Sequence, residues 1–165
     1  MSIKKDLAKI AIQEERLQFQ NFDADTAWKL GNRLKANAET RGVAVTIEIR
    51  VGKETIFFFA MQGAKPENAD WARRKRNVVD LLWRSSYAVG LSLQEEETSL
   101  EAKLGLPLRD YTAHGGSFPI RVVGVGTIGT VTVSGLPQRD DHAMLVDELA
   151  GTLGVPLSEV ALPQA

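Results

Sequence analysis

A glycine-rich segment, residues 111–135, contains the side chains that most clearly suggest chemistry. It begins Tyr-Thr-Ala-His-Gly-Gly-Ser-Phe-Pro-Ile and continues with further glycines. Two adjacent glycines, Gly115 and Gly116, allow unusual backbone angles and a close approach of a ligand to the main chain. His114 and Ser117 place an imidazole and a hydroxyl beside that opening. These residues predict either one edge of a binding pocket or a tight turn that leads into a glycine-containing hairpin.

The same segment includes Gly124-Val-Gly-Thr-Ile-Gly129, which has the G-x-G-x-x-G spacing of a dinucleotide-binding loop. That mechanism places the phosphates at the N-terminus of a helix that directly follows the glycines. Here the glycines lie between strand-like residues and open no helix. We therefore exclude a Rossmann-type site.

A second group of polar residues is the basic run Arg-Arg-Lys-Arg at positions 73–76, within a helix predicted over residues 69–89. At 100° per residue, Arg74 and Lys75 fall within about 60° of the apolar line that begins at Trp71. An unpaired buried charge is costly. We therefore expect these cations either to bind a carboxylate or phosphate of a ligand, or to pair with acidic residues and extend toward solvent.

A third polar cluster, residues 138–142, opens the last predicted helix. Asp140 or Asp141 suits the helix N-terminus, where carboxylates are favoured. His142 falls on the side of the helix that carries Leu145, so we expect it to be partly buried and within reach of a pocket. The chain has two histidines and no cysteine, which excludes three-histidine zinc sites, cysteine ligands and disulfides. We predict no metal site, and no pair of residues defines a catalytic reaction.

Composition indicates one globular domain. The chain has 165 residues, 44% hydrophobic and 25% charged, and a net charge of -1, so nothing favours nucleic acid or acidic lipid as a partner. No apolar run approaches the roughly 20 residues that span a bilayer, and the N-terminus lacks the apolar core of a signal peptide. We expect a cytoplasmic protein in which residues 1–165 form a single domain, with its core over residues 17–153.

The elements that must position these residues predict an α/β fold of the α+β kind. Residues 43–51 alternate apolar and polar side chains, which is typical of an antiparallel strand with one wetter face. Gly52-Lys53 suits a two-residue turn. The strand predicted after it, residues 55–61, contains three consecutive phenylalanines and is apolar on both faces, so it is either a central strand covered by helices on both sides or part of a subunit interface. Two more strands are predicted, over residues 120–125 and 127–133. Helices are predicted over residues 3–17, from Asp23 or Asp25 to 41, and over 69–89, 100–108 and 140–153.

Several of these motifs together resemble a known family. They are Trp71-x-x-Arg-Arg-Lys75, Ser85-Ser86, the long His-Gly-Gly phrase, Val133-Ser-Gly-Leu-Pro137 and Asp141-His142. The chain is similar to the haem-degrading-domain superfamily, also called GlcG-like or HbpS-like. The resemblance implies a profilin-like fold, with an antiparallel central sheet flanked by helices, and assembly into homo-oligomers. It also implies haem binding or degradation, for which His114 and His142 are the available imidazoles.

Two functional hypotheses follow from the residues and the resemblance. In the first, the protein binds a small molecule, haem or another anionic ligand, in a pocket formed by the residues from His114 to Ser117 together with Arg74, Lys75 and His142. In the second, it is a non-catalytic homo-oligomeric scaffold. There Trp83 and Tyr87, on the polar side of the long helix, contribute subunit contacts with the phenylalanine strand.

Overall fold

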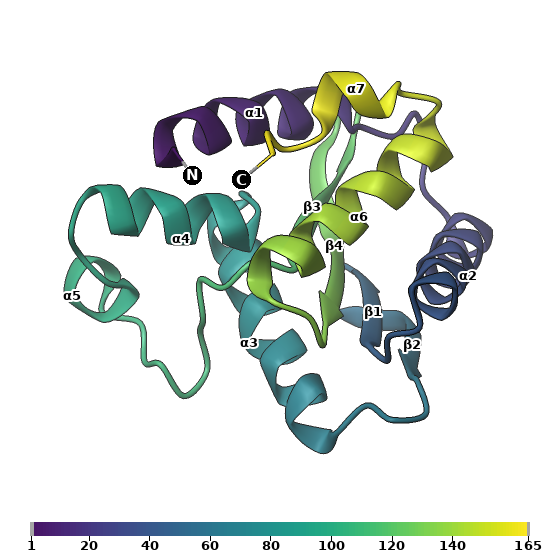
Figure 1. The fold of residues 1–165 in the computed structure, drawn as a ribbon, viewed down its shortest axis with the longest axis horizontal. Coiled ribbons are helices and arrows are strands. Elements are labelled where there is room, and N and C mark those ends of the chain that lie inside the picture. The colour runs from purple at the N-terminus through teal and green to yellow at the C-terminus, as the bar shows by residue number, and fades with distance from the viewer. Residues whose placement is uncertain (1, 165) are drawn as a thin grey trace.

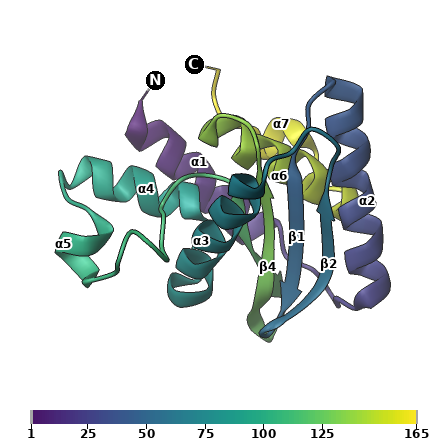
Figure 2. The ribbon, with the colours of Figure 1, turned by 90° about the horizontal axis from the view of Figure 1, so that it is seen from below.

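A four-stranded antiparallel sheet forms the centre of the protein, in the order β2-β1-β4-β3. The computed structural model describes residues 2–164, and Figures 1 and 2 show the sheet with its flanking helices. The strands are β1 (Thr46–Val51), β2 (Glu54–Ala60), β3 (Ser117–Val122) and β4 (Gly126–Ser134). The predicted antiparallel α/β architecture is therefore confirmed.

The two faces of the sheet differ in polarity because side chains alternate along each strand. Apolar residues such as Ile47 and Val133 belong to the main core, which α2 (Ala24–Arg41) and α6 (Gln138–Leu153) cover. The opposite face carries Glu48, Thr132 and other polar residues, and α3 (Pro66–Leu82) packs on it. Figure 2 shows α3 on one side of the sheet and α2 with α6 on the other.

The remaining helices extend this arrangement beyond the sheet. They are α1 (Ile3–Arg16), α4 (Ser86–Glu95), α5 (Leu100–Leu104) and α7 (Leu157–Val160). A small second core joins Ile10 of α1 to Tyr87 and Leu91 of α4. Helices α1 and α7 lie side by side (Figure 1), and the amide nitrogen of Gln13 donates to the carbonyl oxygen of Val160 at 2.7 Å. No helix within residues 2–164 is both long and apolar enough to span a bilayer.

Several predicted boundaries are confirmed by their local chemistry. Asp23 caps α2 by accepting from the backbone N–H of Thr26 at 2.8 Å, and Gly42 ends the helix in the left-handed conformation at φ 66°. Gly52 has φ 59° in the turn between β1 and β2. The phenylalanine strand is an edge strand: Phe57 faces the core, whereas Phe58 is exposed. The alternative of a central strand covered on both sides is therefore wrong.

The helix predicted over residues 69–89 is wrong as a single helix. It is broken at Trp83, which adopts a left-handed φ of 56°, and the hydroxyl of Ser85 caps α4 by accepting from the N–H of Ala88 at 3.2 Å. The break rotates the residues that follow it. Tyr87 is consequently 2% exposed rather than on the polar side, while Trp83 is 60% exposed. A subunit contact that uses both aromatic side chains is therefore excluded.

Candidate functional site

A buried ion pair joins α3 to α6 beneath the glycine-rich loop. The ammonium of Lys75 lies 2.8 Å from the carboxylate of Asp141, and also donates to the carbonyl oxygen of Val133 at 3.3 Å. The side chains are 5% and 1% exposed. Asp141 also accepts the backbone N–H groups of Gly135 and Leu136. Burial raises the pKa of the Asp141 carboxyl, while Lys75 and the two N–H groups oppose that rise.

The paired glycines leave no room for a side chain: Gly116 lies against the ion pair, and Gly115 lies against the start of α6. Gly116 has φ 125°, and a Cβ there would lie 2.5 Å from the carbonyl oxygen of Val133 and 2.8 Å from the nitrogen of Lys75. A Cβ on Gly115 would lie 2.4 Å from the carbonyl oxygen of Gln138. The close approach expected of a ligand is therefore made by the protein's own backbone and lysine.

His114 and Trp71 form one wall of the site. Their rings stack with centroids 5.1 Å apart and planes 12° from parallel. Partial burial lowers the pKa of His114, and the positive charges of Lys75 and Arg74 lower it further. The imidazole is consequently neutral near pH 7, so it offers one N–H donor and one lone pair.

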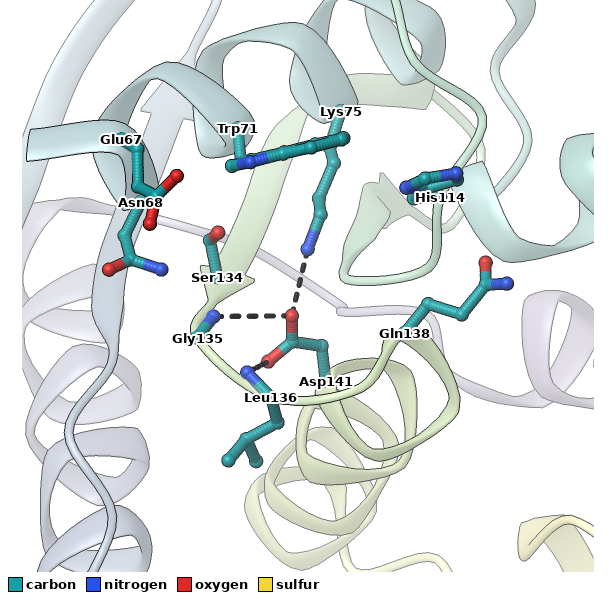
Figure 3. Close-up of a pocket in the computed structure, with 10 residues that line it drawn as sticks. All are labelled: Glu67, Asn68, Trp71, Lys75, His114, Ser134, Gly135, Leu136, Gln138 and Asp141. Atoms are coloured by element: carbon teal, nitrogen blue, oxygen red, sulfur yellow. Dashed lines mark hydrogen bonds and ion pairs between the residues drawn. The ribbon is translucent and has the colours of Figure 1, made fainter. Parts of the chain in front are cut away.

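These residues surround a polar cavity of about 280 Å³, which Figure 3 shows. Besides Lys75, Asp141 and His114, its lining includes Glu67, Asn68, Ser134 and Gln138. Glu67 and Asn68 come from the first turn of α3, Ser134 from the end of β4, and Gln138 from the start of α6. A second hollow of about 410 Å³ shares His114 and Gln138 and is lined in part by leucines 91, 93, 100 and 108. His114 thus stands between a polar and a more apolar depression.

The structure brings together only some of the residues that the sequence analysis assigned to a pocket. Lys75 and His114 line the cavity, and the glycines pass directly over the ion pair. Arg74 instead donates to the carbonyl oxygen of Leu108 at 2.9 Å and packs over the ring of Trp71. It therefore holds the loop before His114 and does not line the cavity.

Ser117 and His142 also lie away from the cavity, inside the fold. The hydroxyl of Ser117 is buried and is 2.8 Å from that of Thr132 on the neighbouring strand. His142 is fully buried, with its Nε2 2.7 Å from the side-chain oxygen of Gln13. Because the amide of Gln13 donates to Val160, its oxygen is the acceptor and Nε2 of His142 carries the proton.

Among the cavity residues that the sequence did not predict are Asp141, the partner of Lys75, and the lining residues Trp71, Glu67 and Gln138. Asp141 was interpreted as a helix cap, and Trp71 as part of an apolar line. No local pattern indicates that residues 75 and 141 meet, because their contact depends on the packing of α3 and α6 around the sheet. Residues 2–164 contain no group of three or more His, Asp or Glu side chains placed to hold a metal ion.

The burial of His142 predicts an acid-sensitive contribution to stability. Burial, together with the charge of Arg139, lowers the pKa of His142 to about 3, from 6.5 in the unfolded chain. Between these two pKa values the imidazole is protonated in the unfolded chain and neutral in the folded protein. The free energy of unfolding therefore decreases as the pH falls. Replacing His142 by glutamine, which keeps a donor for Gln13, should remove this dependence. Between pH 7 and pH 5 we expect the variant to lose about 2 kcal/mol less than the wild type.

The measurement is urea unfolding of both proteins at the two pH values. Other groups titrate in both proteins alike, so the difference between the two isolates residue 142. Equal losses in the wild type and His142→Gln would contradict the assignment of a neutral buried imidazole.

The fold and the site define a class of small α/β domains in which an antiparallel sheet and the starts of two helices enclose a polar cavity. The chain belongs to the HbpS-like family, described as haem degrading protein HbpS-like, whose profile matches residues 22–150. It is 60% identical over 162 residues to a UPF0303 protein of Azotobacter vinelandii, covering 98% of each chain. The family resemblance inferred from the motifs is confirmed.

Solved structures share the fold at lower sequence identity. The Ybr137w protein superposes with a TM-score of 0.82 at 24% identity, covering 90% of this chain and 87% of that one. HbpS gives a TM-score of 0.65 at 20% identity, covering 83% and 93% of the two chains. A structure described as a PduOC:Heme complex gives 0.63 at 16% identity, covering 84% and 95%. These similarities establish the shared architecture.

Proposed function

We propose that the protein binds a small anionic molecule in the cavity between α3 and α6. The observation that carries the proposal is the buried ammonium of Lys75 at the cavity wall, beside the neutral imidazole of His114. Two of the three ammonium donors are used by Asp141 and Val133, which leaves one for a ligand. A charge-assisted hydrogen bond in such a site is stronger than one in water.

Haem is the anionic ligand that the family description and the haem-bound structural neighbour favour. Of the two histidines, His114 is exposed and His142 is enclosed, so His114 is the imidazole that can reach an iron. Pockets that enclose drug-sized ligands measure about 300–1,000 Å³, so the polar cavity alone is too small for a tetrapyrrole. The residues fit haem only if it extends over both hollows, where His114 would hold the iron and Lys75 would hold a haem carboxylate. Bound haem would supply the redox chemistry of its iron.

Titration with haem and with small carboxylates tests the proposal directly. The protein should carry no histidine tag, because a tag supplies imidazoles of its own. If haem is the ligand, His114→Ala should lose the absorbance spectrum of histidine-ligated iron, whereas Lys53→Ala, an exposed position in the β1–β2 turn, should retain it. Small carboxylates should bind to the wild type in calorimetry whether or not haem does. A protein that binds neither haem nor any carboxylate would overturn the proposal.

Self-association through β2 is the second proposed function, and it corresponds to an oligomeric scaffold. It is supported by the exposure of Phe58 and Phe59, 50% and 38%, on the strand at the edge of the sheet. An exposed apolar edge strand is a template for pairing with another chain. Light scattering should give a multiple of the 18.1 kDa chain mass. Phe58→Glu should reduce that mass, and the matched change Trp83→Glu, at a residue exposed elsewhere, should not. A wild-type mass of one chain would exclude this function.

A further inference from the structure

The cavity has an uneven distribution of hydrogen-bonding groups. Two of its amide side chains are fixed by backbone N–H groups: the oxygen of Gln138 accepts from Gly115 at 3.1 Å, and that of Asn68 accepts from Lys65 at 2.9 Å. In each amide, the NH₂ group is consequently the part that is left for another partner. With the spare donor of Lys75, these groups give the lining of the cavity three side chains with a hydrogen-bond donor to offer.

The acceptors of the cavity are fewer and lie in a different place. The carboxylate of Asp141 is occupied by Lys75 and by two backbone N–H groups. Glu67 also lines the cavity, is exposed, and forms no ion pair within residues 2–164. Figure 3 shows Glu67 and Asn68 at one end of the group, and His114 and Gln138 at the other. Glu67 is therefore the free carboxylate of the site.

Glu67 and Lys75 are separated along α3. Eight residues correspond to a helix rise of about 12 Å, shortened where the lysine side chain leans toward the start of its helix. A ligand that meets both charges must be extended, because an α-amino acid carries its two charged groups on the same carbon atom. The volume of about 280 Å³ restricts it to a small molecule.

We infer that the cavity selects an extended aminocarboxylate, with its carboxylate at Lys75 and Gln138 and its ammonium group at Glu67. This inference rests on the proposed anion-binding function and adds the chemical class of the ligand. Lys75 supplies the affinity for the carboxylate, and Glu67 discriminates between ligands by the charge at their far end. A haem carboxylate would use Lys75 without any contact to Glu67.

Three five-carbon probes that differ only at the far end test the inference by calorimetry. They are 5-aminopentanoate, pentanoate and glutarate, which end in an ammonium, a methyl and a carboxylate group. Exposed ion pairs change an equilibrium constant by up to about fivefold. We therefore expect 5-aminopentanoate to bind about fivefold more tightly than pentanoate, and glutarate to bind more weakly than either. Glu67→Gln should bring the three affinities together and leave that of pentanoate unchanged.

Glu101→Gln is the matched control, because Glu101 occupies the first turn of α5 as Glu67 does that of α3, and it does not line the cavity. It should preserve the order of the three probes. If pentanoate binds but the probes show no order, or if Glu67→Gln keeps the wild-type order, the inference is overturned and the anion-binding function stands. If none of the probes binds, the inference is overturned, and the anion-binding function falls with it only if haem and other carboxylates do not bind either.

Discussion

Replacement of Lys75 by methionine is expected to cost about 3–5 kcal/mol of the free energy of unfolding. The variant leaves the carboxylate of Asp141, which is 1% exposed, without its cation. Removing that cation lets burial raise the pKa of Asp141 still further. Because protonation then relieves the buried charge, the loss of stability should be smaller at pH 5 than at pH 8. Urea unfolding at both pH values measures it, and the binding of small carboxylates should be abolished.

A double variant separates the charge from the contacts that surround it. Lys75→Met with Asp141→Asn removes both charges. The asparagine oxygen can still accept from the backbone N–H of Leu136, while its NH₂ group replaces the oxygen that accepts from Gly135. Replacing a buried pair by neutral groups of similar volume is often close to neutral. We expect the double variant to recover most of the stability but not the binding. A double variant as unstable as Lys75→Met would show that the ion pair is not the cause.

Alanine at Gly116 is expected to destabilise the fold and to disturb the cavity. The backbone angle, φ 125°, costs an alanine about 1–3 kcal/mol. The added methyl group would also overlap the carbonyl oxygen of Val133 and the ammonium of Lys75, which adds about 1–3 kcal/mol of overpacking. Thermal and urea unfolding measure the sum, and a loss of carboxylate binding reports the displaced lysine.

Gly124 supplies the control for this substitution. It also has a positive φ, 76°, but a Cβ there meets nothing within 4 Å. Gly124→Ala should therefore cost only the backbone strain, about 1–2 kcal/mol, and leave binding intact. Similar losses at the two positions would indicate that the crowding over Lys75 is unimportant.

The sequence predicts the sheet well where the local pattern and the tertiary environment agree. The alternation of β1 identifies a strand with one apolar and one polar face, and both faces are now seen to be covered by helices. The caps of α2 follow from Asp23 and Gly42, whose effects are local. The inward direction of Lys75 follows from helix geometry alone. The structure confirms that Lys75 is buried.

The rest of the site depends on contacts between distant parts of the chain. Asp141 and His142 are neighbours in α6, yet one meets Lys75 at the cavity and the other meets Gln13 inside the fold. Helical periodicity places adjacent residues about 100° apart. It therefore predicts that Asp141 and His142 point in different directions, but it does not predict which element each side chain contacts. The break at Trp83 was also missed, because a bulky residue in the left-handed conformation contradicts its intrinsic preference.

The polar face of the sheet affects the order in which parts of the protein unfold locally. Helix α3 is attached to this face by the pair of Arg76 with Glu48 and by the hydrogen bond of Lys75 to the carbonyl oxygen of Val133, and to α6 by the pair of Lys75 with Asp141. The opposite face is joined to α2 and α6 by apolar burial. A low pH protonates carboxylates and so weakens ion pairs, whereas it leaves apolar packing unchanged. Under such conditions α3 should exchange its amide hydrogens as one local unit before the core opens. The helix that lines the cavity is thus the part of the fold whose local stability depends most on the pH of the solvent.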